Sequence, residues 1–99
     1  MANFTVRVEL HEKSSNQKPD YETLHKRMAD EGFLRTIKLK DGDPSYQLPT
    51  AEYSYIDNTI TKEQVLQKAK NAAVKVDENY MVLVTQSDYA RAWYNLPKK

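Results

Sequence analysis

Three side chains that could act together on a phosphodiester alternate along one segment near the N-terminus: Arg7, Glu9 and His11. Residues two apart on a strand project from the same face about 7 Å apart, so Glu9 and His11 can converge on one atom. A histidine exchanges protons near neutral pH, and an arginine neutralises phosphate charge. One interpretation of this spacing is therefore a phosphodiester site, with Glu9 and His11 as catalytic candidates.

A second interpretation of the same residues is a solvated sheet face with cross-strand charge pairs. A divalent metal held by Glu9 and Glu12 is a variant of the first interpretation. The chain has no cysteine and no spacing typical of zinc ligands. The sequence therefore assigns no metal ligand and indicates no particular cofactor.

Further basic residues could extend the phosphate site from neighbouring elements. His25 is a third catalytic candidate, one position off the apolar stripe of a predicted helix, and Arg27 follows it. Lys38 and Lys40 are two residues apart on the next predicted strand and therefore lie on the same face of it. Together with Arg7, the residues Arg27, Lys38 and Lys40 are the predicted phosphate contacts. The alternative for His25 is a partly exposed helix residue without a catalytic role.

Hydrophobic periodicity predicts the elements that must position these residues. Asp20 and Thr61 have the side chains of helix N-caps, Gly32 suits a left-handed helix end, and Pro49-Thr50 suggests a bulge. The predicted elements are strand 4–11, a helix from 20 to 32, strand 33–40, strand 46–55, a helix from 61 to 76, strand 80–84 and a short helix after 87.

Right-handed crossovers on this order predict an α+β fold, a ferredoxin-like βαββαβ sandwich. Its four-stranded antiparallel sheet would carry both helices on one face, with the first and third strands in the centre. A short C-terminal helix would follow. We expect a single domain over residues 1–99, with a core at 4–86 and an aromatic tail at 87–99.

The residues themselves suggest a second copy of the chain as a partner. The formal net charge is only +1, so no global basic field is present. Both the odd-numbered and the even-numbered residues of Tyr80–Val84 are apolar, so both faces of this strand are apolar. This predicts that the aromatic tail or a second copy covers the second face. We therefore expect a homodimer through Tyr80–Val84 and the tail. No segment has the pattern of a membrane span or a signal peptide, which predicts a cytoplasmic protein without membrane contact.

Several short segments resemble the GhoS group, the antitoxins of type V toxin–antitoxin systems. The likeness lies in Phe4-Thr5-Val6-Arg7-Val8-Glu9-Leu10-His11, Gly32-Phe33, Leu48-Pro49-Thr50-Ala51-Glu52-Tyr53 and the segment from Tyr89 to Tyr94. The resemblance implies a ferredoxin-like endoribonuclease that cleaves the messenger RNA of a small membrane-damaging toxin. It also implies a likeness to the dimeric CRISPR adaptation nuclease of the same fold.

Two positions depart from the pattern of that family. The basic position associated with function falls on His25, where the family has an arginine. The acidic residue at the end of the first strand would be Glu9 or Glu12, with His11 between them. The functional hypotheses are therefore a GhoS-like RNA-cleaving antitoxin or, as the alternative, a non-catalytic homodimeric interaction module. A small-molecule-binding regulatory domain is a third hypothesis.

Overall fold

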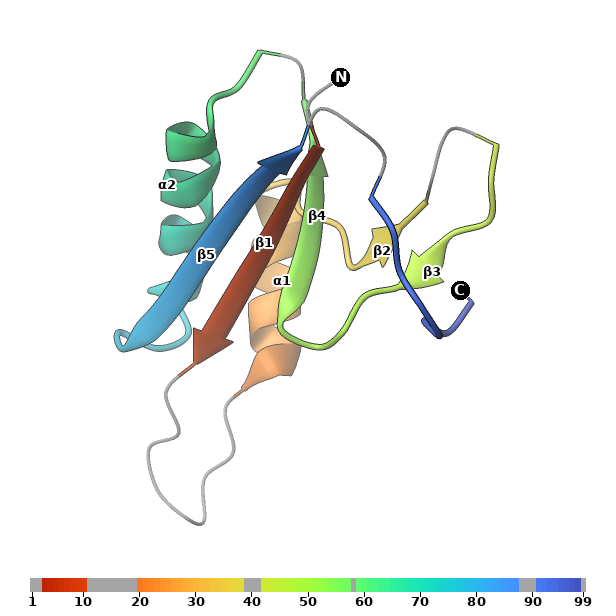
Figure 1. Ribbon diagram of the computed structural model, residues 1–99. Helices are drawn as coiled ribbons and strands as arrows, with labels where there is room; N and C mark the ends of the chain where they lie inside the picture. Colours follow the sequence, from red (N-terminus) through yellow and green to blue (C-terminus); the bar gives the residue numbers. More distant parts are fainter. Residues whose placement is uncertain (1–2, 11–19, 39–41, 58, 88–90, 99) are drawn as a thin grey trace.

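The computed structural model describes residues 3–10, 20–38, 42–57, 59–87 and 91–98 of the 99-residue chain. Two helices and two antiparallel sheets form within them, so the expected α+β class is confirmed (Figure 1). In chain order the elements are β1 (Asn3–Leu10), α1 (Tyr21–Asp30), β2 (Thr36–Ile37), β3 (Tyr46–Gln47), β4 (Glu52–Ile56), α2 (Lys62–Ala73) and β5 (Tyr80–Ser87).

The larger sheet has three strands in the order β4-β1-β5, and both helices lie against the same side of it (Figure 1). β1 runs antiparallel to both neighbours, which confirms its predicted central place and the edge position of the last strand. Phe4, Val6 and Val8 of β1 are fully buried and pack with Leu24 and Met28 of α1. Because strand side chains alternate, the odd-numbered residues of β1 point to the side without helices.

The predicted four-stranded sheet does not form. Residues 33–40 were expected to be one long strand, but the described part contains only the two-residue β2. β2 pairs with β3 in a separate small sheet, which confirms the expected hairpin partners. A single antiparallel bridge joins Leu34 to Ser54 of β4, with both backbone N–H···O distances at 2.8 Å.

The break between β3 and β4 falls where a bulge was predicted, at Pro49-Thr50. Pro49 cannot donate a backbone hydrogen bond, and its carbonyl accepts one from Glu52 N at 2.9 Å to close a turn. The Arg35 guanidinium donates to the carbonyls of Leu48, at 2.8 Å, Pro49, at 2.7 Å, and Glu52. These contacts stabilise the turn, so the predicted third strand is divided between the two sheets.

Both helices begin at the predicted caps. Asp20 Oδ1 accepts from Thr23 N at 3.0 Å at the start of α1. Thr61 and Gln64 form a reciprocal capping box, in which Gln64 N donates to Thr61 Oγ1 at 3.1 Å and Thr61 N donates to Gln64 Oε1 at 2.8 Å. Gly32 follows α1 with a φ of +94°, the left-handed conformation that was expected there.

The C-terminal segment docks, as expected, but residues 91–98 are not helical, and residues 88–90 lie outside the described part. Instead the segment passes across the β2–β3 pair (Figure 1), and Lys98 forms an antiparallel bridge with Tyr46 of β3. Gln47 N donates to Pro97 O at 2.8 Å, and the Trp93 ring lies 5.6 Å from the ring of Tyr46. The free backbone of β3 and the Tyr46 ring hold this segment extended. It therefore packs on the small sheet, and the described residues leave the helix-free side of β5 uncovered.

Among the described helices, none has the length and apolar content needed to cross a membrane, since α2 is the longest at 12 residues.

Candidate functional site

The helix-free side of the larger sheet, which we term the open face, carries the central predicted site residues. Strand register assigns its members, because residues paired across strands share a face. Arg7 of β1 pairs with Glu52 of β4 and Leu83 of β5, and Glu9 pairs with Met81. The open face consists of Asn3, Thr5, Arg7, Glu9, Glu52, Ser54, Ile56, Met81, Leu83, Thr85 and Ser87.

Arg7 lies between two carboxylates at the centre of the open face. Its Nη2 is 3.1 Å from Glu9 Oε1, and its Nη1 is 3.5 Å from Glu52 Oε2. The cross-strand pair of the second interpretation is therefore present between Arg7 and Glu52. About half of the Arg7 side chain is exposed, so each pair contributes at most about 1 kcal/mol. One positive and two negative charges give this centre a net negative charge, which repels phosphate.

His25 lies on the other side of the sheet from Glu9. Its Nδ1 is 2.5 Å from the phenolic oxygen of Tyr53, which is fully buried on the side covered by the helices. A cavity of about 560 Å³ opens here, lined by His25, Ala29, Phe33, Leu34, Arg35, Thr36 and Gln47. The structure therefore does not bring His25 and Glu9 together on one substrate atom.

The environment of His25 favours its neutral form. Burial lowers the pKa of His25, the nearby charge of Arg35 lowers it further, and Glu22 opposes these effects. Burial raises the pKa of the Tyr53 hydroxyl far above its ordinary value, so the phenol stays protonated. We therefore assign Tyr53 Oη as the donor and the neutral imidazole Nδ1 of His25 as the acceptor.

The remaining predicted residues are dispersed. Arg27 is exposed on α1 and lies 4.0 Å from Asp30 in a helical ion pair. Lys38 follows β2 and lines a small cavity at the border of the open face. His11 and Lys40, together with Glu12, lie outside the described residues. Of the predicted site residues that the structure describes, Arg7 and Glu9 are thus the two that lie together.

The sequence did not single out Arg91, which reaches the open face from the C-terminal segment. Its Nη1 donates to the Phe4 carbonyl and to Thr5 Oγ1, both at 3.3 Å. Burial lowers the pKa of its guanidinium, although arginine remains charged in proteins. The sequence did contain one indication of this contact. Arg91 lies among the aromatic residues of the tail, and that tail was expected to dock.

Within the described ranges, no group of three or more His, Asp or Glu side chains is arranged to hold a metal ion. The chemistry that this part of the chain offers is charge pairing at Arg7, a neutral histidine–phenol pair, and exposed or half-buried cations near β2. No protein-family model, curated protein or solved structure matches the chain. A functional proposal consequently depends on the residues themselves and on the resemblance to the GhoS group.

Proposed function

We propose that the protein is a cytoplasmic, GhoS-like antitoxin with a ferredoxin-like fold, and that it binds and cleaves the messenger RNA of a toxin. The single observation that carries the proposal is a helix-free sheet face with Arg7 and Glu9 at its centre and the cations Lys38 and Arg91 at one border. An extended RNA chain can lie across such a surface, with phosphates near the cations.

The arrangement of layers supports the ferredoxin-like part of the proposal. Both helices cover one face, β1 is central, and β5 is at an edge, as that fold requires. The Leu34–Ser54 bridge stands where the second strand would pair with the third. In this proposal the chain is a variant in which the second strand keeps a single bridge to the main sheet.

Glu9 is the proposed proton acceptor on the open face, and His11, a catalytic candidate of the sequence hypothesis, is the proposed proton donor. Glu9 shares Arg7 with Glu52, and this pairing orients the Glu9 carboxylate on the open face. His25 contacts Tyr53 on the side of the sheet that the helices cover, away from the open face. In this proposal His25 therefore has no part in cleavage.

RNA binding and cleavage by the full chain test this proposal. We expect the affinity for single-stranded RNA to fall as salt rises from about 50 to 200 mM, because phosphate contacts release counterions. We expect Glu9→Gln and His11→Ala to slow cleavage by about 100-fold or more, the usual size of a lost acid or base. Glu63→Gln, an equal change on the exposed surface of α2, is the matched control.

Equal cleavage by the wild type and all three variants would contradict the proposed catalytic role and would indicate a contaminating nuclease. Salt-sensitive binding without cleavage would support an antitoxin that sequesters its RNA. Absence of RNA binding at the lowest salt concentration would refute the RNA proposal as a whole.

A second candidate function is a homodimeric interaction module, which β5 favours. This strand forms one edge of the sheet, and within the described residues its outer side has no strand partner. Met81 and Leu83 are 65% and 63% exposed. A groove of about 310 Å³ between β5 and α2 is lined by Lys62, Glu63, Leu66, Val82, Leu83 and Val84. A second copy, related by a two-fold axis, would pair the edges and bury these side chains.

A further inference from the structure

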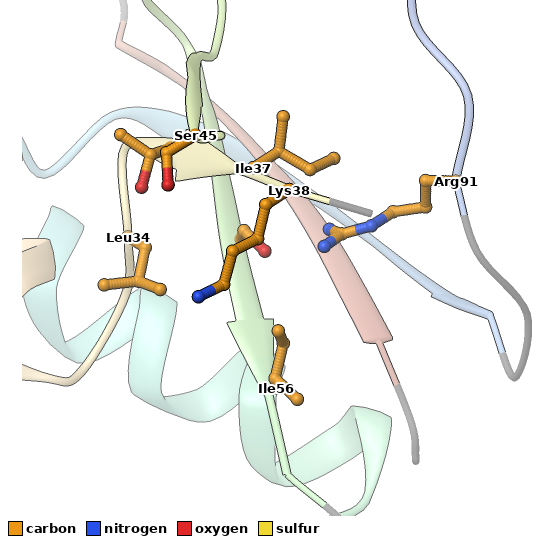
Figure 2. Close-up of a pocket in the computed structure, with 8 residues that line it drawn as sticks. Leu34, Ile37, Lys38, Ser45, Ile56 and Arg91 are labelled. Atoms are coloured by element: carbon orange, nitrogen blue, oxygen red, sulfur yellow. The ribbon is translucent and has the colours of Figure 1, made fainter. Parts of the chain in front are cut away.

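A small cavity lies where β2, β4 and the C-terminal segment meet (Figure 2). Its volume is about 110 Å³. Figure 2 shows the Arg91 side chain extending from the C-terminal segment toward that of Lys38. The lining residues are Leu34, Thr36, Ile37, Lys38, Ser45, Ser54, Ile56 and Arg91.

Arg91 brings a positive charge to this cavity, and no carboxylate of the described residues is paired with it. Its hydrogen-bond acceptors are the Phe4 carbonyl and the Thr5 hydroxyl, which are neutral, and both distances are long at 3.3 Å. Among the described residues, no Asp or Glu lies within ion-pair distance of its guanidinium. A half-buried arginine in this state has donors available to an anion.

The other lining groups suit a small anion as well. Lys38 adds a second cation, and Thr36, Ser45 and Ser54 contribute hydroxyl groups, which can donate hydrogen bonds. None of the described residues that line the cavity is acidic. The other arginines near the sheet differ, because Arg7 is paired with two carboxylates and Arg35 is committed to three backbone carbonyls.

We propose that this cavity binds one phosphate group, with Arg91 as the principal cation and Lys38 as the second. The proposal deepens the proposed function, since it rests on RNA being the source of that phosphate. The cavity is smaller than the roughly 300–1,000 Å³ of sites that enclose drug-sized ligands. It therefore fits a phosphate group of a chain that continues outside the cavity, rather than a whole enclosed nucleotide.

Two probes separate the phosphate site from RNA binding: inorganic phosphate and a short single-stranded RNA. Both are titrated into the isotopically labelled full chain, and backbone amide shifts report the place of binding. We expect phosphate to shift the amides of Leu34, Thr36 and Ser45. We expect Arg91→Gln to weaken phosphate and RNA binding by about 10-fold or more, since a hydrogen bond to a charged group contributes about 1.5–3 kcal/mol.

Lys70→Gln, on the exposed surface of α2, is the control with the same loss of charge. Arg91→Gln could release the C-terminal segment and so disturb the cavity. Lys38→Gln changes an exposed side chain instead and gives a second measurement of phosphate and RNA binding. Each variant's amide spectrum is compared with that of the wild type to show that the sheet is retained.

The outcomes distinguish the two proposals. Phosphate binding that depends on Arg91, without RNA binding, keeps the site and refutes RNA as its source. RNA binding that Arg91→Gln and Lys38→Gln leave unchanged refutes the site and keeps the RNA proposal. Phosphate shifts that are absent, or that are the same in Arg91→Gln and Lys70→Gln, also refute the site.

Discussion

His25 and Tyr53 join α1 to β4 through a short contact, with Nδ1 2.5 Å from the phenolic oxygen and the rings edge to face at 5.5 Å between centroids. Tyr53 is fully buried, so its hydroxyl requires a partner inside the protein. His25 supplies that partner. The histidine that the family resemblance placed at a functional position therefore has a packing role in this fold.

We predict that His25 titrates below its ordinary pKa of 6.5, because burial and the charge of Arg35 disfavour the imidazolium. NMR titration of the ring protons would measure the midpoint directly. His11 is the chain's second histidine, and a His11→Ala sample would assign the two signals. A His25 midpoint at or above 6.5 would contradict the predicted environment.

The same shift predicts a pH dependence of stability. In the interval between the folded pKa of His25 and 6.5, the unfolded chain binds more protons than the folded chain. Lowering the pH through this interval therefore lowers the free energy of unfolding. His25→Asn keeps an acceptor for Tyr53 but cannot titrate, so urea unfolding at several pH values should show a smaller acid-side loss in this variant. Identical losses would contradict the prediction.

Arg35 is predicted to be more important for stability than its partly exposed position implies. Its guanidinium donates to the carbonyls of Leu48, Pro49 and Glu52 and lies 5.4 Å from the centre of the Tyr53 ring. We expect Arg35→Met to lower the free energy of unfolding by about 2 kcal/mol or more. Arg27→Met, which removes an exposed ion pair, should cost about 0.5 kcal/mol or less. Equal losses in urea unfolding would contradict this role.

Gly32 and Gly42 permit a comparison of backbone strain with steric crowding. Both have positive φ angles, +94° and +90°. A Cβ at Gly32 would lie 3.2 Å from Cε2 of Tyr55, whereas nothing lies within 4 Å of one at Gly42. We expect alanine at either site to cost about 1–2 kcal/mol through the backbone. The loss for Gly32→Ala should be the larger of the two in chemical unfolding.

The exposed side chains of β5 predict self-association. If a second copy pairs with this edge, Leu83→Lys places a charge in the interface and should shift sedimentation from dimer toward monomer. Val74→Lys introduces the same charge at an exposed position after α2 and should leave the sedimentation unchanged. A wild-type protein that sediments as a monomer at every concentration would refute the dimer.

Local patterns were sufficient to predict much of the fold. The alternation of β1, the cap at Asp20, the capping box at Thr61 and the left-handed Gly32 all depend on interactions within a few residues. Such features are therefore readable along the chain. They also predicted which side chains of β1 are buried and that Arg7 and Glu9 share the opposite face.

The missed features depend on contacts between distant segments. The third predicted strand divides because Arg35, 13 residues before Leu48, binds the carbonyls of its turn. The tail remains extended because Gln47 offers a backbone donor to Pro97. Arg91 reaches Thr5 across 86 positions of sequence. No periodicity within one segment could reveal these pairings. The candidate site is divided between two faces of the sheet for the same reason, because contacts between distant segments direct its side chains.

Among the described residues, few links attach the small β2–β3 sheet to the rest of the protein: the Leu34–Ser54 bridge, the guanidinium of Arg35 and the docked C-terminal segment. Few attachments mean that this part can open without global unfolding. Native-state hydrogen exchange should therefore show Gln47 and Leu34 exchanging together, and earlier than Val6. Shortening the chain before Arg91 would accelerate that exchange while the β1 amides remain protected.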